Sequence, residues 1–348
     1  MQLVQNVPFF SIMLSMVSAI VTPVLPRRAA KWLSVGVVAA VVCLHIWFVP
    51  FMISYGGSYN YMMGHFPAPW GNELRAGLLE AAIALALSVV MLLSQLAGLN
   101  KLQRQIDPPK QGFFYVMCNL VMAGMLALVY TNDLFTAYVF IEILALSSCA
   151  LMVARQLGHT MVASMRYMIL SLLGSGLILI AIALTYNLTG HLLMENIHDV
   201  IAVYAANGEY ALPITVIIGL FIAGIAIKCG VFPFHMWLPD AYAYSTSAAS
   251  AVLSSVVSKA YFFLLVKIFY RVIGIDVIMS DMALNLMLVL GISSMIIGSI
   301  GAIRCLDIRR MVAYSSVSQM GYLFAWVGLG SEVGVAAAMF HLVVHAMC

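Results

Sequence analysis

The chain has 348 residues, of which 64% are hydrophobic and only 8% are charged. A soluble globular protein carries roughly 25% charged residues, so this composition excludes a water-soluble fold of this size and indicates a chain that lies in lipid. Sixteen Lys and Arg residues against thirteen Asp and Glu residues give a net charge of only +3, which argues against binding to nucleic acid.

Apolar runs of about 20 residues, long enough to cross a bilayer, recur along the whole chain. We expect about eleven transmembrane helices, at residues 8–24, 30–53, 77–98, 112–131, 134–154, 162–187, 212–236, 245–271, 282–303, 311–330 and 332–348. The six cysteines are scattered without a CxxC pair, and we interpret them as small apolar residues. The predicted fold class is therefore all-α, a polytopic helical membrane protein with one membrane domain.

Basic residues fall mainly on one side of the expected helices. With the N-terminus outside, the cytoplasmic loops and their margins hold Arg27, Arg28, Lys31, Lys101, Arg104, Lys110, Arg155, Arg166, Arg304, Arg309 and Arg310. The opposite side holds only Arg75 and Arg271. Because positive loops stay in the cytoplasm, we expect an integral protein of a prokaryotic cytoplasmic (inner) membrane with its N-terminus outside.

The last expected helix, from Glu332 to Cys348, is still apolar where the sequence stops. At 1.5 Å per residue it reaches roughly 25 Å, less than the hydrocarbon thickness. We therefore expect a C-terminally truncated chain that ends within a helix.

Ionisable residues inside membrane helices are functional candidates, because each costs roughly 2.5–3.5 kcal/mol on insertion scales. Glu142 lies near the middle of the fifth expected helix. Its carboxyl group is predicted to bind a proton or to pair with a cation; packing against a neighbouring serine or carbonyl is the alternative.

Lys228 is followed within twelve residues by Gly230, Pro233 and Pro239, so its helix is predicted to break soon after the lysine. Broken helices at membrane depth recur at ion sites. A buried lysine can exchange a proton near neutral pH, whereas the alternative is a lysine that caps the carbonyl groups freed by the break. His235, close to the break, is an accessory candidate for gating or relay.

Lys259 lies in the middle of the eighth expected helix, beside Ser254, Ser255 and Ser258, and is a further proton-relay candidate. Lys267 is expected to reach the membrane surface with its long side chain and is left out of the site. His341 and His345 are four residues apart and share one helix face. A third metal ligand is missing, so the pair favours a proton relay over zinc, with two neutral packed histidines as the alternative.

Other polar positions are interpreted more simply. Asp133 and Asp240 are expected to cap helix ends, and the cluster from Arg304 to Arg310 to be a cytoplasmic loop. The candidates together form a series of one carboxylate, two amines and two imidazoles that can pass a proton by coupled changes in pKa. No nucleophile–base arrangement, GxGxxG or CxxC set is present, so neither a cofactor nor a metal is expected.

Four motifs in order carry a family resemblance: Tyr138-Val-Phe-Ile-Glu142, the stretch from Lys228 to Lys259 with Phe232-Pro-Phe-His-Met-Trp-Leu-Pro-Asp-Ala241, Asp307-Ile-Arg-Arg-Met-Val-Ala-Tyr314, and His341-Leu-Val-Val-His345. From about residue 112 onward the chain resembles the proton-translocating antiporter-like subunits shared by complex I, Mrp-type antiporters and membrane-bound hydrogenases. The first three helices resemble them weakly.

The resemblance implies a fourteen-helix fold with two inverted five-helix repeats. Residues 1–111 would then be an N-terminal three-helix part, residues 112–275 the first half-channel, and residues 276–348 a truncated second half-channel. It also implies that Glu142 pairs with Lys228, that Lys259 passes the proton centrally, and that His341 and His345 carry it onward.

The sequence departs from the family pattern at Thr246, where many relatives have proline, and at Gly77, where an aspartate is frequent. The loop Phe66–Arg75 favours the Mrp D-type or hydrogenase-linked branch. Two functions stay open: a D-like component of an Mrp-type sodium/proton antiporter, and a proton-pumping subunit of a redox enzyme such as an NADH:quinone oxidoreductase or a hydrogenase. Both imply other membrane subunits as partners and H⁺ as the ion, with Na⁺ as a second ion in the antiporter. A third interpretation is a scaffold whose buried charges only pack helices.

Overall fold

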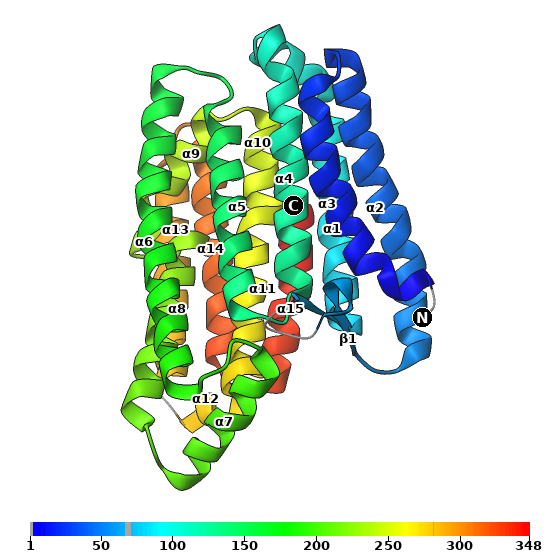
Figure 1. The fold of residues 1–348 in the computed structure, drawn as a ribbon. Coiled ribbons are helices and arrows are strands. Elements are labelled where there is room, and N and C mark those ends of the chain that lie inside the picture. The colour runs from blue at the N-terminus through cyan, green and yellow to red at the C-terminus, as the bar shows by residue number, and fades with distance from the viewer. Residues whose placement is uncertain (1–2, 67–70, 281) are drawn as a thin grey trace. The chain divides into compact units, whose positions relative to one another are not determined.

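The computed structural model describes residues 3–66, 71–280 and 282–348 (Figure 1). The chain forms two compact units, which we describe separately. Unit 1 comprises the described residues up to Ser164, with Tyr244–Ala260 and Met347; unit 2 comprises Met165–Ala243, Tyr261–Ala346 and Cys348. The division at residues 112 and 276 that the family resemblance implies stays a prediction. Part of the loop used for subfamily placement, residues 67–70, lies outside the described residues.

Unit 1 is a bundle of long antiparallel helices. Its helices are α1 (Val7–Val21), α2 (Arg27–Tyr55), α3 (Leu78–Gln105), α4 (Gln111–Tyr130), α5 (Leu134–Val153), the start of α6 (Gly158–Thr189) and α10 (Ser247–Val252). Helix α2 begins after Pro26 and ends at Gly56, whose φ of 69° suits a left-handed cap. Helix α4 packs against α1, α2 and α5 and forms the centre of the unit.

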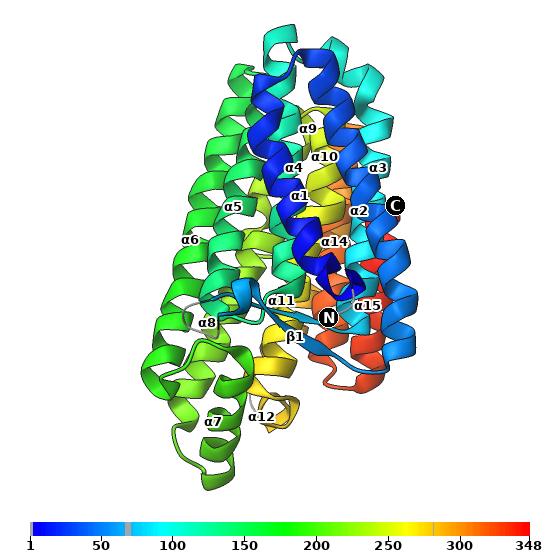
Figure 2. The same cartoon turned by 45° about the vertical axis from the view of Figure 1, so that its right-hand side comes forward.

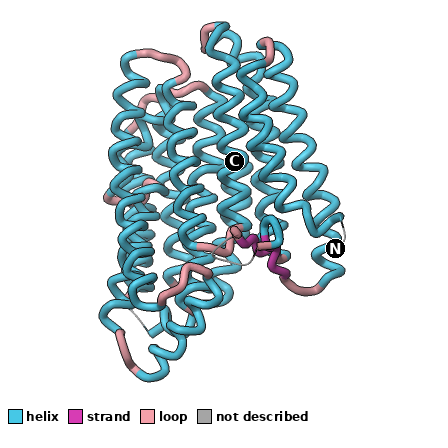
Figure 3. The backbone as a smooth tube through the Cα atoms, in the orientation of Figure 1, coloured by secondary structure: helices cyan, strands magenta, loops and turns pink. Residues whose placement is uncertain are grey.

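A short β-hairpin, which the sequence analysis did not anticipate, fills the connection between α2 and α3. Strands β1 (Tyr59–Met62) and β2 (Glu73–Ala76) pair antiparallel, with Tyr59 opposite Ala76 and Met62 opposite Glu73. It is drawn in magenta in Figure 3. Only four residues long on each side, it leaves the all-helical class of the fold unchanged.

Unit 2 contains most of α6 together with α7 (Met194–Asn207), α8 (Ala211–Cys229), α9 (Leu238–Tyr244), most of α11 (Ser258–Ile268), α12 (Ile275–Ser280), α13 (Ala283–Arg304), α14 (Ile308–Gly328) and α15 (Glu332–Met347). Helix α7 was not expected. It is amphipathic, buries Met194, Ile197 and Ile201, and packs against the π-helical turn Phe269–Ile273 at the end of α11.

The expected membrane helices are present. Within the described residues, nine helices are long and apolar enough to cross a bilayer, and they match the first nine expected segments. The two remaining segments also fold as helices, α14 and α15, of which α14 is more polar and α15 has only 16 residues. The prediction of a polytopic all-helical membrane protein is therefore confirmed.

Burial separates helices that face the surroundings from helices enclosed by protein. In the most apolar stretch of α6 only 39% of the residues are buried, whereas in the most apolar stretch of Ser247–Ile273 the buried share is 94%. Exposed leucines and isoleucines along α6 are typical of a helix that faces a membrane or another membrane subunit. Lys259, in contrast, lies on a segment that is enclosed almost completely.

Candidate functional site

Glu142 lies on α5, which begins where Asp133 accepts a hydrogen bond from the backbone N–H of Thr136 at 2.5 Å. The expectation that Asp133 caps a helix is thus confirmed. Glu142 is half-buried, and its Oε1 atom is buried without a hydrogen-bond donor among the described residues. Tyr138, one turn earlier, interacts with it electrostatically. A buried carboxyl oxygen without a donor is poorly compensated, so Glu142 is a candidate for pairing with a cation.

Lys228 lies in the last turn of α8, in unit 2, and is only 2% exposed. Its Nζ donates a hydrogen bond to the Ser171 hydroxyl of α6 at 3.0 Å. The same Nζ lies 5.3 Å from the centre of the Tyr261 ring, within the range of a cation–π interaction. The amine therefore has polar and aromatic neighbours that come from two other helices.

The predicted break after Lys228 is present. Gly230 has a φ of 69°, and a 3₁₀ turn at Phe234–Trp237 leads into the short helix α9. The backbone N–H groups of Gly230 and Val231 donate to the carbonyls of Ile227 and Ala226, which is the Schellman pattern. The Trp237 indole also donates to the Ile227 carbonyl, at 3.3 Å. The carbonyl groups of Ala226 and Ile227, in the last turn of α8, are therefore hydrogen-bonded without a contribution from Lys228.

A close crossing of α6 and α8 brings Ser171 to Lys228. A Cβ atom added at Gly224 would lie 2.6 Å from the Ile178 side chain and 2.8 Å from the Gly174 carbonyl. Glycine at this crossing lets the two backbones approach. Gly224 is one turn before Lys228, and Gly174 is about one turn after Ser171, so the same crossing sets the hydrogen-bond distance.

Arginines fix the far end of the interrupted segment. Asp240, on α9, forms ion pairs with Arg166 at 2.9 Å and with Arg310 at 3.1 Å, and Arg309 donates to the Ala243 carbonyl at 3.2 Å. Asp240 is therefore more than the helix cap expected from the sequence. Arg309 and Arg310 likewise do more than mark a positive loop, because they tie α14 to α9.

Lys259 is fully buried at the start of α11, directly after a π-helical turn, Leu253–Val257. Its Nζ donates to the Ser254 carbonyl and, at 3.4 Å, to the Ser258 hydroxyl. Wide π turns inside α-helices are frequent at functional sites. The serines that suggested a polar surrounding in the sequence are thus direct neighbours of the amine.

The expectation for Lys267 was wrong. Its side chain is only 3% exposed, so it does not extend to the membrane surface. The reason is tertiary: α11 is enclosed along nearly its whole length, and a long side chain has no open path outward. A second π turn, Phe269–Ile273, follows it. Lys267 is therefore a buried amine, like Lys228 and Lys259.

The three candidate histidines of unit 2 form two groups. On α15, the rings of His341 and His345 are stacked 6.3 Å apart, and Tyr322 of α14 lies 5.7 Å from His341. The two histidines do share one helix face, as their spacing predicted. His235 is half-buried in the 3₁₀ turn, with its ring 6.3 Å from that of Tyr314.

The candidates are divided between the two units: Glu142 and Lys259 belong to unit 1, and Lys228 and the three histidines belong to unit 2. Within unit 2 the structure links Lys228 to Ser171 and Tyr261, and His341 to His345. The pairing of Glu142 with Lys228, and the order of proton passage, stay predictions.

Sequence reasoning missed a buried polar cluster in unit 1. His45 of α2 is fully buried, with Nδ1 2.8 Å from the Val41 carbonyl and Nε2 3.0 Å from the Tyr130 hydroxyl. Because a carbonyl only accepts, the neutral ring carries its proton on Nδ1 and accepts from Tyr130 at Nε2. Glu80 is buried within electrostatic range of Tyr130. The sequence signal for this cluster was His45 itself, an ionisable residue inside the second expected helix.

Fold and site together define a class: a polytopic helical membrane protein with lysine amines buried where helices are interrupted or widened. Comparison with known families is more specific. Residues 131–348, more than half of the chain, match the family described as "NADH:quinone oxidoreductase/Mrp antiporter, TM". The chain belongs to this family, and the resemblance seen in its motifs is confirmed.

The relatives are of two kinds. The chain is 31% identical to NADH-quinone oxidoreductase subunit N of Desulforudis audaxviator over 293 residues, covering 84% of this chain and 57% of the relative. It is 25% identical to the D-type subunit of the Na(+)/H(+) antiporter of Alkalihalophilus pseudofirmus, covering 81% of this chain and 55% of the relative. The chain thus spans a little over half the length of these relatives.

A solved structure shares the fold. One chain of the membrane-bound sulfane sulfur reductase, an archaeal respiratory membrane complex, superposes with a TM-score of 0.86 at 28% identity. The match covers 98% of this chain and 68% of that chain. The helical arrangement described above is therefore that of the antiporter-like membrane subunits.

Proposed function

We propose that this chain is a proton-translocating subunit of a multi-subunit membrane assembly, and that protons pass through Glu142, Lys228, Lys259, His341 and His345, with His235 as an accessory group. The observation that carries the proposal is the burial of two amines in interrupted or widened helices, Lys228 at 2% and Lys259 at 0% exposure. Lysine amines at such enclosed positions are the groups that take up and release the proton in this proposal.

In this relay, Glu142 and Lys228 form the gating pair. A proton on Glu142 removes the negative charge that would hold Lys228 charged, and Lys228 then releases its own proton. Lys259 receives it and the stacked histidines take it further. The Ser171 and Ser258 hydroxyls orient the two amines and are able to accept hydrogen bonds from their charged forms.

The driving reaction has two candidates. The Mrp-like candidate is a D-type component of a cation/proton antiporter, supported by the likeness to the antiporter of Alkalihalophilus pseudofirmus and by the motif resemblance. The second candidate is a proton pump driven by electron transfer in a partner, supported by the relatives named subunit N and by the likeness to the archaeal respiratory complex. Partner subunits with iron–sulfur or nickel centres would favour the second, and a sodium requirement for proton flux the first.

Proton flux in liposomes tests the relay. The complete assembly is reconstituted with a pH-sensitive dye inside, and flux is measured for Glu142→Gln, Lys228→Ala and Lys259→Ala. We expect each variant to lose flux by about tenfold or more, since proton-transfer groups contribute factors of that order. Lys101→Ala, an exposed lysine near the end of α3, is the matched control and should retain its flux.

Unchanged flux in all three variants, with normal assembly, would favour a scaffold and would end the proposal. Orientation is tested separately in whole cells: with basic helix ends in the cytoplasm, a protease added outside should spare the loops next to Arg28 and Lys101.

A further inference from the structure

A basic pocket opens in unit 1 where α1 turns into α2. It has a volume of about 700 Å³, and its lining includes Arg27, Arg28, Lys31, Trp32, Gln111 and Tyr115. We call it the α2 basic pocket. Its volume lies within the usual range for ligand pockets, roughly 300–1,000 Å³.

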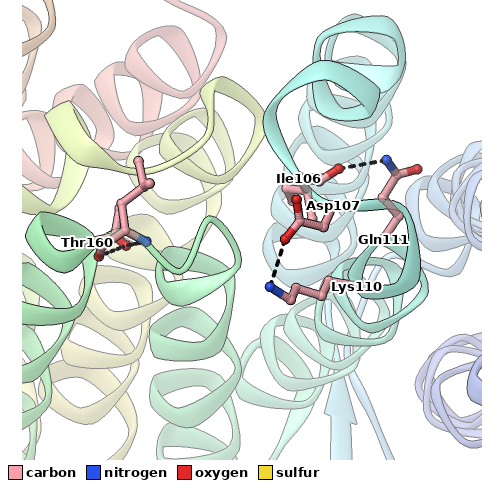
Figure 4. Close-up of polar contacts among 6 residues, drawn as sticks. Ile106, Asp107, Lys110, Gln111 and Thr160 are labelled. Atoms are coloured by element: carbon pink, nitrogen blue, oxygen red, sulfur yellow. Dashed lines mark hydrogen bonds and ion pairs between the residues drawn. The ribbon is translucent and has the colours of Figure 1, made fainter.

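Positive charge in this pocket has no counter-charge. Arg27, Arg28 and Lys31 form no ion pair with any described residue, and no acidic residue is among those that line the pocket. Lys110, in the nearby turn between α3 and α4, differs because it pairs with Asp107 at 2.8 Å (Figure 4). Lys31 has only an aromatic partner, since its Nζ lies 5.2 Å from the centre of the Trp32 ring. Three cations without an acidic partner repel each other, and an anion between them would relieve that repulsion.

The start of α2 adds to the positive electrostatic potential of the pocket. This 29-residue helix follows Pro26, and no side chain caps its first turn. Its first backbone N–H groups therefore need acceptors, and the positive end of the helix dipole lies beside the three cations. Phosphate oxygens are suitable acceptors for such a site.

Buried polar residues complete the pocket. Tyr115 is only 2% exposed and lines the pocket, its hydroxyl has no hydrogen-bond partner among the described residues, and its ring lies within electrostatic range of Arg27. Gln111 is equally buried, and its amide N–H is held by the Ile106 carbonyl at 2.9 Å (Figure 4). The Tyr115 hydroxyl faces this pocket as a donor, and a ligand oxygen in the pocket is able to accept its hydrogen bond.

The surroundings of the pocket select the ligand. Figures 1 and 2 place the α1–α2 turn at one end of unit 1, beside the start of α4. Next to the charged residues lie exposed apolar ones, with Val24 at 85% and Trp32 at 62% exposure. A free phosphate would use only the charges, whereas a phospholipid covers the apolar residues with its acyl chains as well. We propose that the α2 basic pocket binds the phosphate headgroup of an anionic phospholipid.

Lipid titration tests the proposal. The full chain, purified in its assembly and stripped of lipid in detergent, is titrated with phosphatidylglycerol, with phosphatidylcholine and with inorganic phosphate, and bound lipid is counted by native mass spectrometry. We expect saturable binding of phosphatidylglycerol that is at least about tenfold tighter than that of phosphatidylcholine. Equal binding of the two lipids, or displacement of phosphatidylglycerol by millimolar phosphate, would overturn the lipid assignment.

Variants separate the pocket from general attraction to positive loops. The triple variant Arg27→Gln/Arg28→Gln/Lys31→Gln should weaken phosphatidylglycerol binding by about a hundredfold, since each surface cation contributes about a factor of five. The control Lys101→Gln/Arg104→Gln removes two exposed cations near the end of α3 and should leave the binding within about twofold. Tyr115→Phe keeps the fold and every charge, and should still weaken binding several-fold. Equal losses in pocket and control variants, or an unaffected Tyr115→Phe, would contradict the proposal.

Discussion

Lys228 and Lys259 are both buried amines, but their polar neighbours come from different parts of the structure. Lys228 sits at the end of an interrupted helix, and its neighbours, the Ser171 hydroxyl and the Tyr261 ring, come from other helices. Lys259 sits in a helix that continues, and its acceptors, the Ser254 carbonyl and the Ser258 hydroxyl, come from the preceding turn of the same helix. These neighbours of Lys228 are tertiary, whereas these two acceptors of Lys259 are local.

This contrast predicts which structural changes will alter the hydrogen bonds of each amine. A change in helix packing should alter Lys228 more than Lys259, because it moves the acceptor away from the donor. A change in the π turn Leu253–Val257 should alter Lys259 alone. What the two positions share in the proposed relay is the need for an amine that is able to lose its proton.

The largest effect is expected from Lys228→Arg and Lys259→Arg. A guanidinium keeps the positive charge and hydrogen-bonding capacity but does not deprotonate in proteins. If both amines trade protons, each variant should lose proton flux in liposomes by about tenfold or more. Lys101→Arg is the matched control. Normal flux in either arginine variant would show that this position needs only a charge, and the two lysines would then differ in role.

Packing between α6 and α8 is tested by Gly224→Val. The new side chain would meet Ile178 and the Gly174 carbonyl, and such overpacking usually costs about 1–3 kcal/mol. We expect a lower melting temperature in detergent and a loss of flux, because Ser171 is pushed away from Lys228. Gly219→Val, on the same helix, is the control, because a Cβ at Gly219 meets nothing within 4 Å. Equal melting of the two variants would contradict the close crossing.

Removing single hydroxyl groups should have smaller and unequal effects. Ser171→Ala deletes an acceptor from another helix, and hydrogen bonds to charged groups contribute about 1.5–3 kcal/mol. Ser258→Ala leaves the Ser254 carbonyl in place for Lys259. We therefore expect the pH at which flux is half-maximal to shift in Ser171→Ala and to shift less in Ser258→Ala. The reverse order would mean that the acceptor on α6 matters less than the local one.

The contrast also explains how much the sequence could predict. Membrane helices follow from apolar runs, and the break after Lys228 follows from Gly230 and Pro233, which act on the chain next to them. The serines that surround Lys259 could be predicted as well, because they are its neighbours in the sequence. All these signals are local in the chain.

Other features depend on residues far apart in the sequence. Ser171 is 57 positions from Lys228, and nothing in either helix alone indicates that the two meet. The burial of Lys267 depends on the helices that surround α11. The length of the lysine side chain alone therefore wrongly predicted that it reaches the membrane surface. The π turns and the β-hairpin also depend on packing between segments.

The smallest effect is expected at the surface end of the interrupted segment. Arg166 is exposed, with 60% of its side chain accessible, so Arg166→Gln should lower stability by at most about 1 kcal/mol, the usual limit for an exposed pair. Asp240 keeps Arg310 in this variant. Asp240→Asn weakens both pairs and should lower the melting temperature more, and both effects should shrink as salt is added. A large loss in Arg166→Gln alone would mean that α6 is held at this end by Asp240 rather than by its glycine crossing with α8, and the tertiary surroundings of Lys228 would then depend on a surface charge.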